Sequence, residues 1–366
     1  MSVKYGQLRP RTVSEARKCD AELDEYDKIH DDGDGKRWIT GTESAARKEV
    51  EALDAMNCFK YLDDDEEERL KSENYDRIHY TTAWDIKASG QKKCRLAARG
   101  DKVPVSEDED TYASVLESTS ARLCMISAAA NKQDVVIGDI SSAFIHSRID
   151  TRLYIRCGPE FGDREGKIAV VQRGLYGLRQ ASRLWQNHLS VVMLSNGWIR
   201  SKRDENVWLR KEKRMFEGQY YREMYSSYVD DALVASHWPG EVFEELERCL
   251  KVKFAEKPDM FLGGEIRYGS TNMLVTTAAN YIGEIVQQHE REVGKLPGHD
   301  VPSAEDDHPE LLVGEEATPL DGTEKRKFQR ICGQLLWVSG GLGRIDVSFT
   351  AASLSRFGSR PQKGHC

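Results

Sequence analysis

The sequence predicts an α+β fold, with one mixed sheet and helices packed on one of its faces. Two observations support this prediction. The chain has 366 residues, which is enough for two or three domains and a sizeable buried core. Between residues 133 and 277 the patterns run strand, helix, two strands, helix and strand. Such mixing within one region is typical of an α+β domain, and the split βαβ arrangement is one candidate.

The first third of the chain predicts helices and basic strands after an irregular start. Residues 1–42 lack periodicity and include the turn-rich "HDDGDGK", so we expect a poorly ordered segment. Helical spacing follows at residues 43–62, and short strands rich in basic residues follow at 80–99. Residues 116–132 suit a second helix. Its apolar stripe contains Leu116, Leu123 and Ile126.

The central third contains the strongest helix signal. Residues 133–145 open as a buried strand and turn at Ser141–Ser142, and residues 168–173 form another strand. Residues 180–197 predict a helix, since five apolar side chains share one face and Gly197 suits a C-cap. Those five side chains are Leu184, Trp185, Leu189, Val192 and Met193. The segments "ENVWLR" and "YYREMYSSYV" then read as strands.

The last third predicts a helix, a hairpin and a helical tail. Residues 241–254 are amphipathic through Phe243, Leu246 and Leu250, and "MFLGGEIRYG" with "NMLVTT" reads as a pair of strands. An acidic stretch separates this hairpin from the tail. We therefore divide the chain into a poorly ordered start, a main body, an acidic linker and a helical tail. Their limits are residues 1–42, 43–290, 291–323 and 324–366.

The charge distribution favours a polyanionic partner, although the net charge of −8 alone argues weakly against one. Acidic residues gather at 63–68, 107–110 and 300–316, which we interpret as solvated loops or linkers. Residues 92–102 are strongly cationic. Between residues 164 and 214, Lys and Arg outnumber Asp and Glu by twelve to four. Local charge guides a polyanion more than total charge does.

Cysteine usage and hydropathy limit the compartment. None of the eight cysteines forms a C-x-x-C pair, so we expect no zinc ribbon or redox motif, and a reducing compartment fits. No apolar run approaches the length of a membrane span, and the N-terminus lacks a signal-peptide core. We therefore expect a soluble protein with no membrane partner, in the cytoplasm or the nucleus.

Three carboxylates stand out chemically. Asp230 and Asp231 are adjacent within the apolar stretch "MYSSYVDDALVAS", where unpaired acids are costly to bury. Asp139 ends the strand "DVVIGD". Each has an ordinary interpretation, as a turn or cap residue or as the exposed tip of a hairpin. If the three converge, they form an oxygen-ligand set suited to two Mg²⁺ or Mn²⁺ ions, which clamp the attacking and leaving oxygens of a phosphoryl transfer.

Several segments resemble the polymerase of Ty1/copia-type retrotransposons. "YVDD" resembles the catalytic box of reverse transcriptases, and "GDISSAFIH" looks like the "MDVKTAFLNG" box. "RGLYGLRQASRLW" is similar to "YGLKQSPRAW", and "KCRLAARG" to "YKARLVARG". "FLGGEI" resembles the box after the catalytic hairpin, and residues 328–357 match "YRSLVGSLLYLTATRPDI" more loosely. All occur in the family's order, between Glu43 and Phe357.

This resemblance implies a right-hand polymerase fold, with fingers and palm at 43–290 and a partial helical thumb or connection at 324–366. It implies an RNA-directed DNA polymerase that adds dNTPs to a primer 3′-hydroxyl. Asp139, Asp230 and Asp231 would be the catalytic ligands of two Mg²⁺ or Mn²⁺ ions. The partners would be an RNA template, a DNA primer and dNTPs, within a virus-like particle in the cytoplasm or in the nucleus.

The resemblance also assigns substrate contacts. On the nucleotide side, Phe144 would exclude a 2′-hydroxyl; the alternative is a core phenylalanine, which is common for this residue type. The other nucleotide contacts would be Lys93, Arg95, Arg99, Tyr176 and Gly177. The basic strand could instead be solvated, and Tyr176 could be packing. The template and primer contacts would be Arg179, Arg183, Tyr228, Leu262 and Gly263.

The sequence also departs from the family's pattern. His146 replaces the usual Asn, Gly264 replaces a larger residue, and "GLGRIDV" lacks the proline of "TRPDI". The chain carries no RNase H, protease or integrase signature, so we expect a fragment of a Pol polyprotein whose RNase H and integrase regions would be partners. A domesticated or decayed fragment that only binds RNA is the alternative, and a metal-dependent nuclease explains fewer of the segments.

Overall fold

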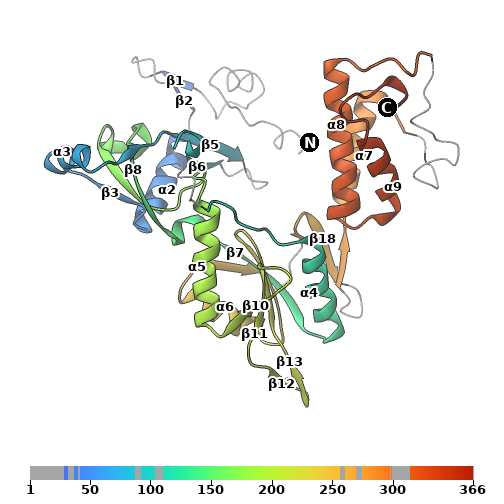
Figure 1. Ribbon diagram of the computed structural model, residues 1–366, viewed down its shortest axis with the longest axis horizontal. Helices are drawn as coiled ribbons and strands as arrows, with labels where there is room; N and C mark the ends of the chain where they lie inside the picture. Colours follow the sequence, from blue (N-terminus) through green and yellow to red (C-terminus); the bar gives the residue numbers. More distant parts are fainter. Residues whose placement is uncertain are drawn as a thin grey trace. The chain divides into compact units, whose positions relative to one another are not determined.

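The computed structural model describes residues 29–31, 37–39, 42–86, 92–103, 110–255, 260–268, 274–296, 298 and 314–365. Figure 1 shows the helices and strands of the chain, coloured along the sequence. The chain forms two compact units, each built from three separate segments. The first unit comprises Met1–Val115, Asp139–Ile199 and Phe243–Lys253, and the second comprises Leu116–Gly138, Arg200–Val242 and Phe254–Cys366. Most of the predicted disordered start and of the acidic linker lies outside the described residues. The predicted domain limits stay predictions.

Two sheets and a helix form the core of the first unit. One sheet has the order β3-β9-β8-β4, and a hairpin pairs β5 with β6. Helix α2 (Thr42–Ala55) buries Val50 and Leu53 in the same apolar cluster as Leu96 of β6 and Ile155 of β8. The strands are β3 (Phe59–Tyr61), β4 (Asp76–Arg77), β5 (Tyr80–Ile86), β6 (Lys92–Ala98), β8 (Arg148–Arg156) and β9 (Ile168–Arg173). A short pair, β1 (Ile29–Asp31) and β2 (Arg37–Ile39), precedes them.

The acidic run at residues 63–68 is not the solvated loop that the sequence predicted. Asp63 caps helix α3 (Asp64–Ser72), because its side chain accepts a hydrogen bond from the Glu66 backbone N–H and Glu66 reciprocates to the Asp63 backbone. The acids that follow occupy the first helical turn, where the helix dipole favours negative charge. The run therefore starts a helix, and the predicted helix over 43–62 ends earlier, at Ala55.

Helix α5 (Ala181–Ser195) of the first unit confirms the strongest helix prediction. Trp185, Leu189, Val192 and Met193 are buried, while Leu184 is half-buried. Gly197 follows the helix with a φ of +78°, a left-handed conformation that suits glycine. Helix α6 (Pro239–Glu247) ends before the predicted limit at 254, because residues from Val252 onward extend into a strand.

The largest sheet has the order β10-β11-β14-β15-β7-β16, and its inner strands belong to the second unit up to Gly138. Antiparallel hydrogen bonding joins β11 to β14 and β14 to β15. The strands are β7 (Asp134–Ile140), β10 (Trp198–Arg200), β11 (Val207–Arg210), β14 (Met224–Tyr228), β15 (Asp231–Ser236) and β16 (Val252–Ala255). A separate hairpin pairs β12 (Arg214–Phe216) with β13 (Gln219–Tyr221).

Helix α4 (Ser118–Ala130) packs on this sheet through a face that the sequence did not predict. Leu123 and Ile126 are about 60% exposed, at 60% and 62%. The buried face carries Ala121, Cys124, Met125 and Ala128, which join an apolar cluster with residues of β14, β15 and β18. Leu116, the third member of the predicted stripe, precedes the helix and is buried in the same cluster. Small side chains allow the helix backbone to approach the sheet closely, so Leu123 and Ile126 face outward.

The rest of the second unit is a three-stranded sheet followed by helices. The sheet has the order β17-β18-β19, from β17 (Met260–Phe261), β18 (Gly264–Tyr268) and β19 (Leu274–Thr277). The helices are α7 (Ala279–Val293), α8 (Gly322–Leu336) and α9 (Ser348–Ser355). Asp321 caps α8 by accepting hydrogen bonds from the Thr323 and Glu324 backbone N–H groups. The described part of the tail is therefore largely helical, as predicted.

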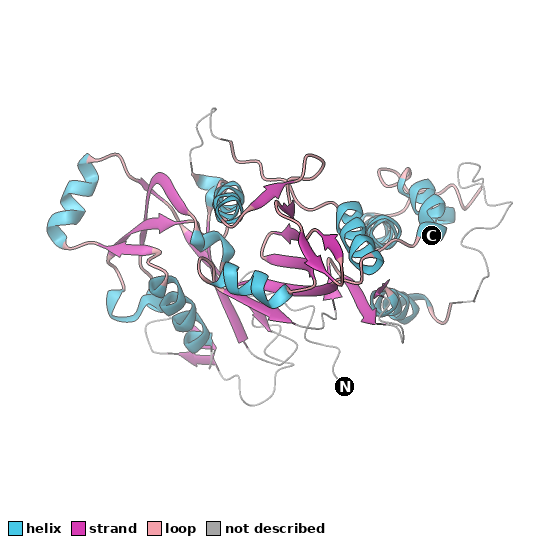
Figure 2. Ribbon diagram, turned by 90° about the horizontal axis from the view of Figure 1, so that it is seen from below, coloured by secondary structure: helices cyan, strands magenta, loops and turns pink. Residues whose placement is uncertain are grey.

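The described chain contains both helices and strands (Figure 2), and both occur in each unit. The predicted mixture of helices and strands is therefore confirmed at that level. Among the described residues, no helix combines the length and the apolar composition needed to cross a membrane.

Candidate functional site

Strand β6 and the turn at Tyr176–Gly177 meet along their backbones in the first unit. The Ala98 N–H donates a hydrogen bond of 2.7 Å to the Tyr176 carbonyl, and Ala97 and Tyr176 form a parallel bridge. Gly177 has a φ of +87°, and a Cβ at this position would collide with the Ala98 carbonyl oxygen. Glycine therefore permits both the backbone conformation and the close approach.

Two further predicted nucleotide contacts surround Tyr176. The Phe144 ring meets the Tyr176 ring edge-on, with centroids 5.1 Å apart, and the Arg95 guanidinium carbon lies 5.1 Å from the centre of the Tyr176 ring. Burial alternates along β6, so Lys93 and Arg95 share the face away from the core residues Cys94 and Leu96. We call Arg95, Phe144, Tyr176 and Gly177 the Tyr176 cluster.

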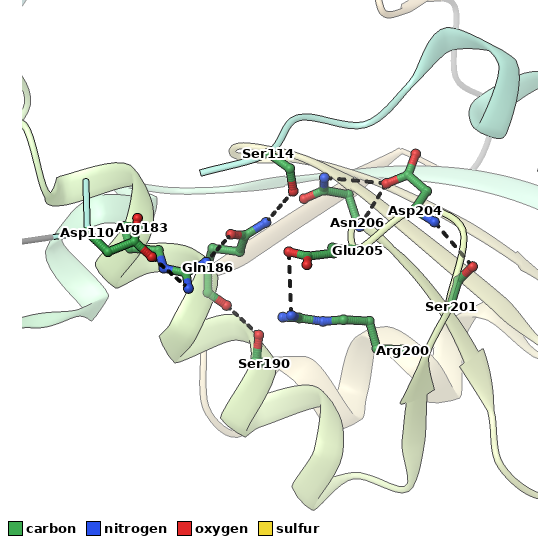
Figure 3. A network of polar contacts seen from close by, with 10 residues as sticks. All are labelled: Asp110, Ser114, Arg183, Gln186, Ser190, Arg200, Ser201, Asp204, Glu205 and Asn206. Atoms are coloured by element: carbon green, nitrogen blue, oxygen red, sulfur yellow. Dashed lines mark hydrogen bonds and ion pairs between the residues drawn. The ribbon is translucent and has the colours of Figure 1, made fainter. Parts of the chain in front are cut away.

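The other predicted basic contacts of the first unit are bound to acidic partners or to backbone. Arg99 forms a two-pronged ion pair with Asp101, at 2.8 and 2.9 Å, and this hydrogen bonding lowers the pKa of Asp101 to about 2. Arg179 donates to the Asp101 carbonyl at 3.3 Å. Arg183 pairs with Asp110 at 3.0 Å and donates to Gln186 (Figure 3). These arginines would have to exchange partners to reach a nucleic acid.

The basic stretch between residues 164 and 214 is neutralised in a similar way. Arg200 pairs with Glu205 (Figure 3), and Arg164 pairs with Asp54 at 2.7 Å. Arg210 and Arg214 both reach Glu223, whose side chain is only 1% exposed. Part of the excess positive charge counted in the sequence is therefore neutralised by ion pairs within the chain.

The hairpin β14–β15 presents the adjacent carboxylates. Tyr228 pairs with Asp231 across the two strands, so Val229 and Asp230 form a two-residue turn. Val229 has a φ of +57°, which is strained for a β-branched residue and typically costs about 1–3 kcal/mol. Asp230 and Asp231 are half-buried, and Tyr228 is 36% exposed. We call this element the carboxylate hairpin.

Helix α4 supports the carboxylate hairpin from its buried side. The Ser226 hydroxyl of β14 donates a hydrogen bond of 3.3 Å to the Cys124 sulfur of α4. Both residues are buried, with Ser226 completely inaccessible. The strand that leads into the turn with the two carboxylates is therefore anchored to helix α4.

Asp139 lies near the end of β7, the strand next to β15 in the large sheet. The preceding Gly138 is the last residue of its segment in the second unit, and Asp139 is the first residue of a segment of the first unit. Asp139 is exposed and accepts a hydrogen bond of 3.4 Å from the Ser141 hydroxyl. Among the described residues, no group of three or more His, Cys, Asp or Glu side chains is placed to hold a metal. Convergence of the three acids stays a prediction.

His146, which stands where the family usually has Asn, lies beside the turn after β7. One ring nitrogen, Nε2, lies 3.3 Å from the Ser141 carbonyl oxygen. In the tautomer that carries its proton on Nε2, the neutral ring can donate a hydrogen bond to that carbonyl. The ring also stacks against His188 and contacts Trp185. Burial lowers the pKa of His146, so the neutral ring predominates at neutral pH.

The predicted primer contacts Leu262 and Gly263 form the turn between β17 and β18. Both have positive φ, at +50° and +74°. A Cβ on Gly263 would lie 3.5 Å from the ring of Trp337, so this indole covers the turn. Trp337 was not predicted from the sequence, although the Ser-Gly-Gly that follows Val338 indicated that a bulky group could approach closely.

Comparison with known proteins defines the class of this protein. Residues 71–295 match the family described as reverse transcriptase (RNA-dependent DNA polymerase). This match covers more than half of the 366 residues, so the chain belongs to the reverse transcriptase family. The resemblance inferred from the motifs is thereby confirmed.

The similar proteins come from retrotransposons. The transposon Ty5-1 protein of Saccharomyces cerevisiae is 29% identical over 236 residues, which cover 62% of this chain and 71% of that protein. The retrovirus-related Pol polyprotein from transposon RE1 of Arabidopsis thaliana is 25% identical over 279 residues, and that from transposon TNT 1-94 of Nicotiana tabacum is 23% identical over 290. Each match covers 75% of this chain but only 18% and 21% of the two polyproteins.

Proposed function

We propose that this chain is the RNA-directed DNA polymerase of a Ty1/copia-like retrotransposon, which extends a DNA primer on an RNA template. The carboxylate hairpin is the observation that carries this proposal. It presents two adjacent acids on a strained two-residue turn, next to the strand that carries Asp139. Strain of this kind persists only where the surrounding structure holds it, and it is concentrated at functional sites.

Carboxylate oxygens are the kind of ligand that divalent metal ions prefer. Asp139 is exposed, and Asp230 and Asp231 are half-buried, so all three can offer carboxylate oxygens to Mg²⁺ or Mn²⁺. When bound, two such ions would activate the primer 3′-hydroxyl and neutralise the pyrophosphate that leaves. The three carboxylates would hold the ions, and their positive charge would offset the repulsion between Asp230 and Asp231.

In this proposal the Tyr176 cluster receives the incoming nucleotide. Arg95 presents a planar guanidinium on the outer face of β6, suited to two phosphate oxygens at once. Its approach to the Tyr176 ring orients that guanidinium. Phe144 is half-buried against the core and also reaches Tyr176, so it can both pack and limit the space for a 2′-hydroxyl.

The wider context is also a proposal. The relatives from RE1 and TNT 1-94 are Pol polyproteins, so RNase H and integrase regions of the same polyprotein are the proposed neighbours. The proposed place of action is a cytoplasmic virus-like particle or the nucleus.

Substitution of Asp230 by Asn tests the proposal. Loss of one metal ligand removes several kcal/mol of transition-state stabilisation, so primer extension with dNTPs and Mg²⁺ should fall by about 10³-fold or more. Binding of primer–template, measured by fluorescence anisotropy, should change less than about threefold, because phosphate contacts dominate that affinity. An Asp230→Asn variant that extends primers at the normal rate would exclude the polymerase assignment.

Glu217 offers a matched control. Like Asp230, it stands in a two-residue hairpin turn, here between β12 and β13. Its own φ is +47°, and its side chain is exposed. Glu217→Gln should leave primer extension unchanged. If the wild-type chain binds primer–template with Mg²⁺ and dNTPs but never extends it, the RNA-binding alternative is the better description.

A further inference from the structure

We infer that Arg122 and Trp337 are positioning residues that fix the Leu262–Gly263 turn relative to the carboxylate hairpin. All of these residues belong to the second unit. The inference rests on the proposed function, in which that turn positions the primer end and the hairpin carries the catalytic acids. Neither Arg122 nor Trp337 belongs to the segments that identified the substrate contacts.

The first contact joins helix α4 to the segment after α8. The Arg122 guanidinium of α4 donates hydrogen bonds of 3.0 and 2.6 Å to the carbonyl oxygens of Gly340 and Gly341. These glycines end a π-helical turn over Trp337–Gly341, a rare form that often marks functional sites. Charge-assisted bonds from one guanidinium to two carbonyls hold this turn firmly.

The second contact joins that π-helical turn to the proposed primer site. A Cβ on Gly341 would overlap the Trp337 ring, so the glycine backbone lies directly against the indole. The edge of the same indole, at Cζ2 and Nε1, covers Gly263. Trp337 is 40% exposed, so one part of the ring contacts the turn while another part faces solvent.

The third set of contacts ties both helix α4 and the Leu262–Gly263 turn to one apolar cluster. Helix α4 holds the carboxylate hairpin through Cys124 and Ser226. Phe261, next to the turn, is buried in the apolar cluster that also contains Leu233 of β15. The turn therefore has Phe261 anchored on one side and Trp337 on the other, and α4 links Trp337 back to the hairpin.

Leu262 explains why such support is required. A non-glycine residue with a φ of +50° is disfavoured, and this turn would relax if nothing held it. The indole over Gly263 opposes that relaxation. A shift of the turn by about 1 Å would misplace a primer terminus and slow the reaction by about 100-fold.

The experiment compares Arg122→Met and Trp337→Ala with the wild-type chain, by primer extension and by hydrogen exchange of the peptide spanning 260–268. Loss of charge-assisted bonds is expected to raise exchange of this peptide about tenfold, with no primer present. The maximal extension rate should fall by a similar factor. The KM for dNTP should stay unchanged, because the proposed nucleotide contacts lie in the first unit.

Three further variants make the result specific. Arg326→Met is the control, since the Arg326 side chain donates a hydrogen bond to Thr323 of its own helix α8, and it should behave as wild type. Trp337→Phe keeps an aromatic ring between Gly263 and Gly341 and should recover most of the rate. The Arg122→Met, Trp337→Ala double variant should be no slower than the worse single variant, since both changes break the same linkage.

The inference would be overturned if hydrogen exchange of residues 260–268 in Arg122→Met were the same as in the wild type. It would also be overturned if the rate losses of the two single variants multiplied in the double variant. A changed KM for dNTP with an unchanged maximal rate would also overturn it. If no variant extends primers, wild type included, but exchange rises as expected, the linkage stands and the proposed function fails.

Discussion

The Tyr176 cluster of the first unit and the carboxylate hairpin of the second unit are held in different ways. Gly177 presses against β6 so closely that no side chain fits, and aromatic and guanidinium groups surround Tyr176. The hairpin instead places a strained valine beside two half-buried acids. The first region is fixed by close packing, and the second holds its geometry against a local backbone preference.

In the proposed function, this difference would separate two tasks. The Tyr176 cluster would recognise a nucleotide by shape and charge, which close packing can define without strain. The carboxylate hairpin would hold like charges side by side, which is favourable only once cations are bound. Changes in the Tyr176 cluster should therefore alter folding stability and nucleotide affinity, whereas changes in the hairpin should alter the rate of chemistry.

Gly177→Ala should give the largest loss of stability. The new methyl group would clash with the Ala98 carbonyl and the φ of +87° disfavours alanine, so the free energy of unfolding should drop by more than about 2 kcal/mol. Urea denaturation checks this value. Gly240→Ala in the first turn of α6 is the control, since nothing lies within 4 Å of its added methyl group. If Gly177→Ala were as stable as Gly240→Ala, the backbones of Gly177 and Ala98 would not be in close contact.

Arg95→Met should weaken nucleotide binding with little effect on folding. Loss of a charged hydrogen-bond donor to phosphate should raise the KM for dNTP about tenfold while the maximal rate changes less. Steady-state extension assays separate the two parameters. Arg77→Met removes an exposed arginine from β4 of the same unit and should leave both parameters unaltered. A normal KM in Arg95→Met would remove Arg95 from the nucleotide site.

Val229→Gly should change stability less than Gly177→Ala and in the opposite direction. Glycine accepts the positive φ, so thermal unfolding should show a gain of about 1 kcal/mol. The extension rate should fall, because the freer turn no longer fixes Asp230. Val229→Ala is the control, since alanine keeps most of the strain and should show no gain in stability. A more stable Val229→Gly variant with an undiminished rate would mean that the strain serves no catalytic purpose.

The sequence predicted those features that depend on local pattern. Strand β7, helix α5 and the hairpin around Asp230 are set by apolar periodicity and turn chemistry within a few residues. The close approach of Gly177 to β6 also agrees with the expected role of a glycine at that point. Motif order then supplied the family, which the match over residues 71–295 confirms.

Features that depend on partners distant in sequence were not predicted. The face of α4 that packs inward is chosen by small side chains that fit the sheet, so Leu123 stays outside. Arg183 meets Asp110, and Arg122 meets Gly340, over separations that no local pattern records. The number of basic residues therefore overestimated the charge available to a nucleic acid.

The proposed function requires Asp139 and the carboxylate hairpin to hold the same pair of ions. Mn²⁺ binding tests it most directly, by electron paramagnetic resonance on the chain with a dideoxy-terminated primer–template and dNTP. The account predicts that Asp139→Asn and Asp230→Asn each weaken Mn²⁺ binding about tenfold or more. Full Mn²⁺ binding by Asp139→Asn, beside a loss in Asp230→Asn, would contradict it.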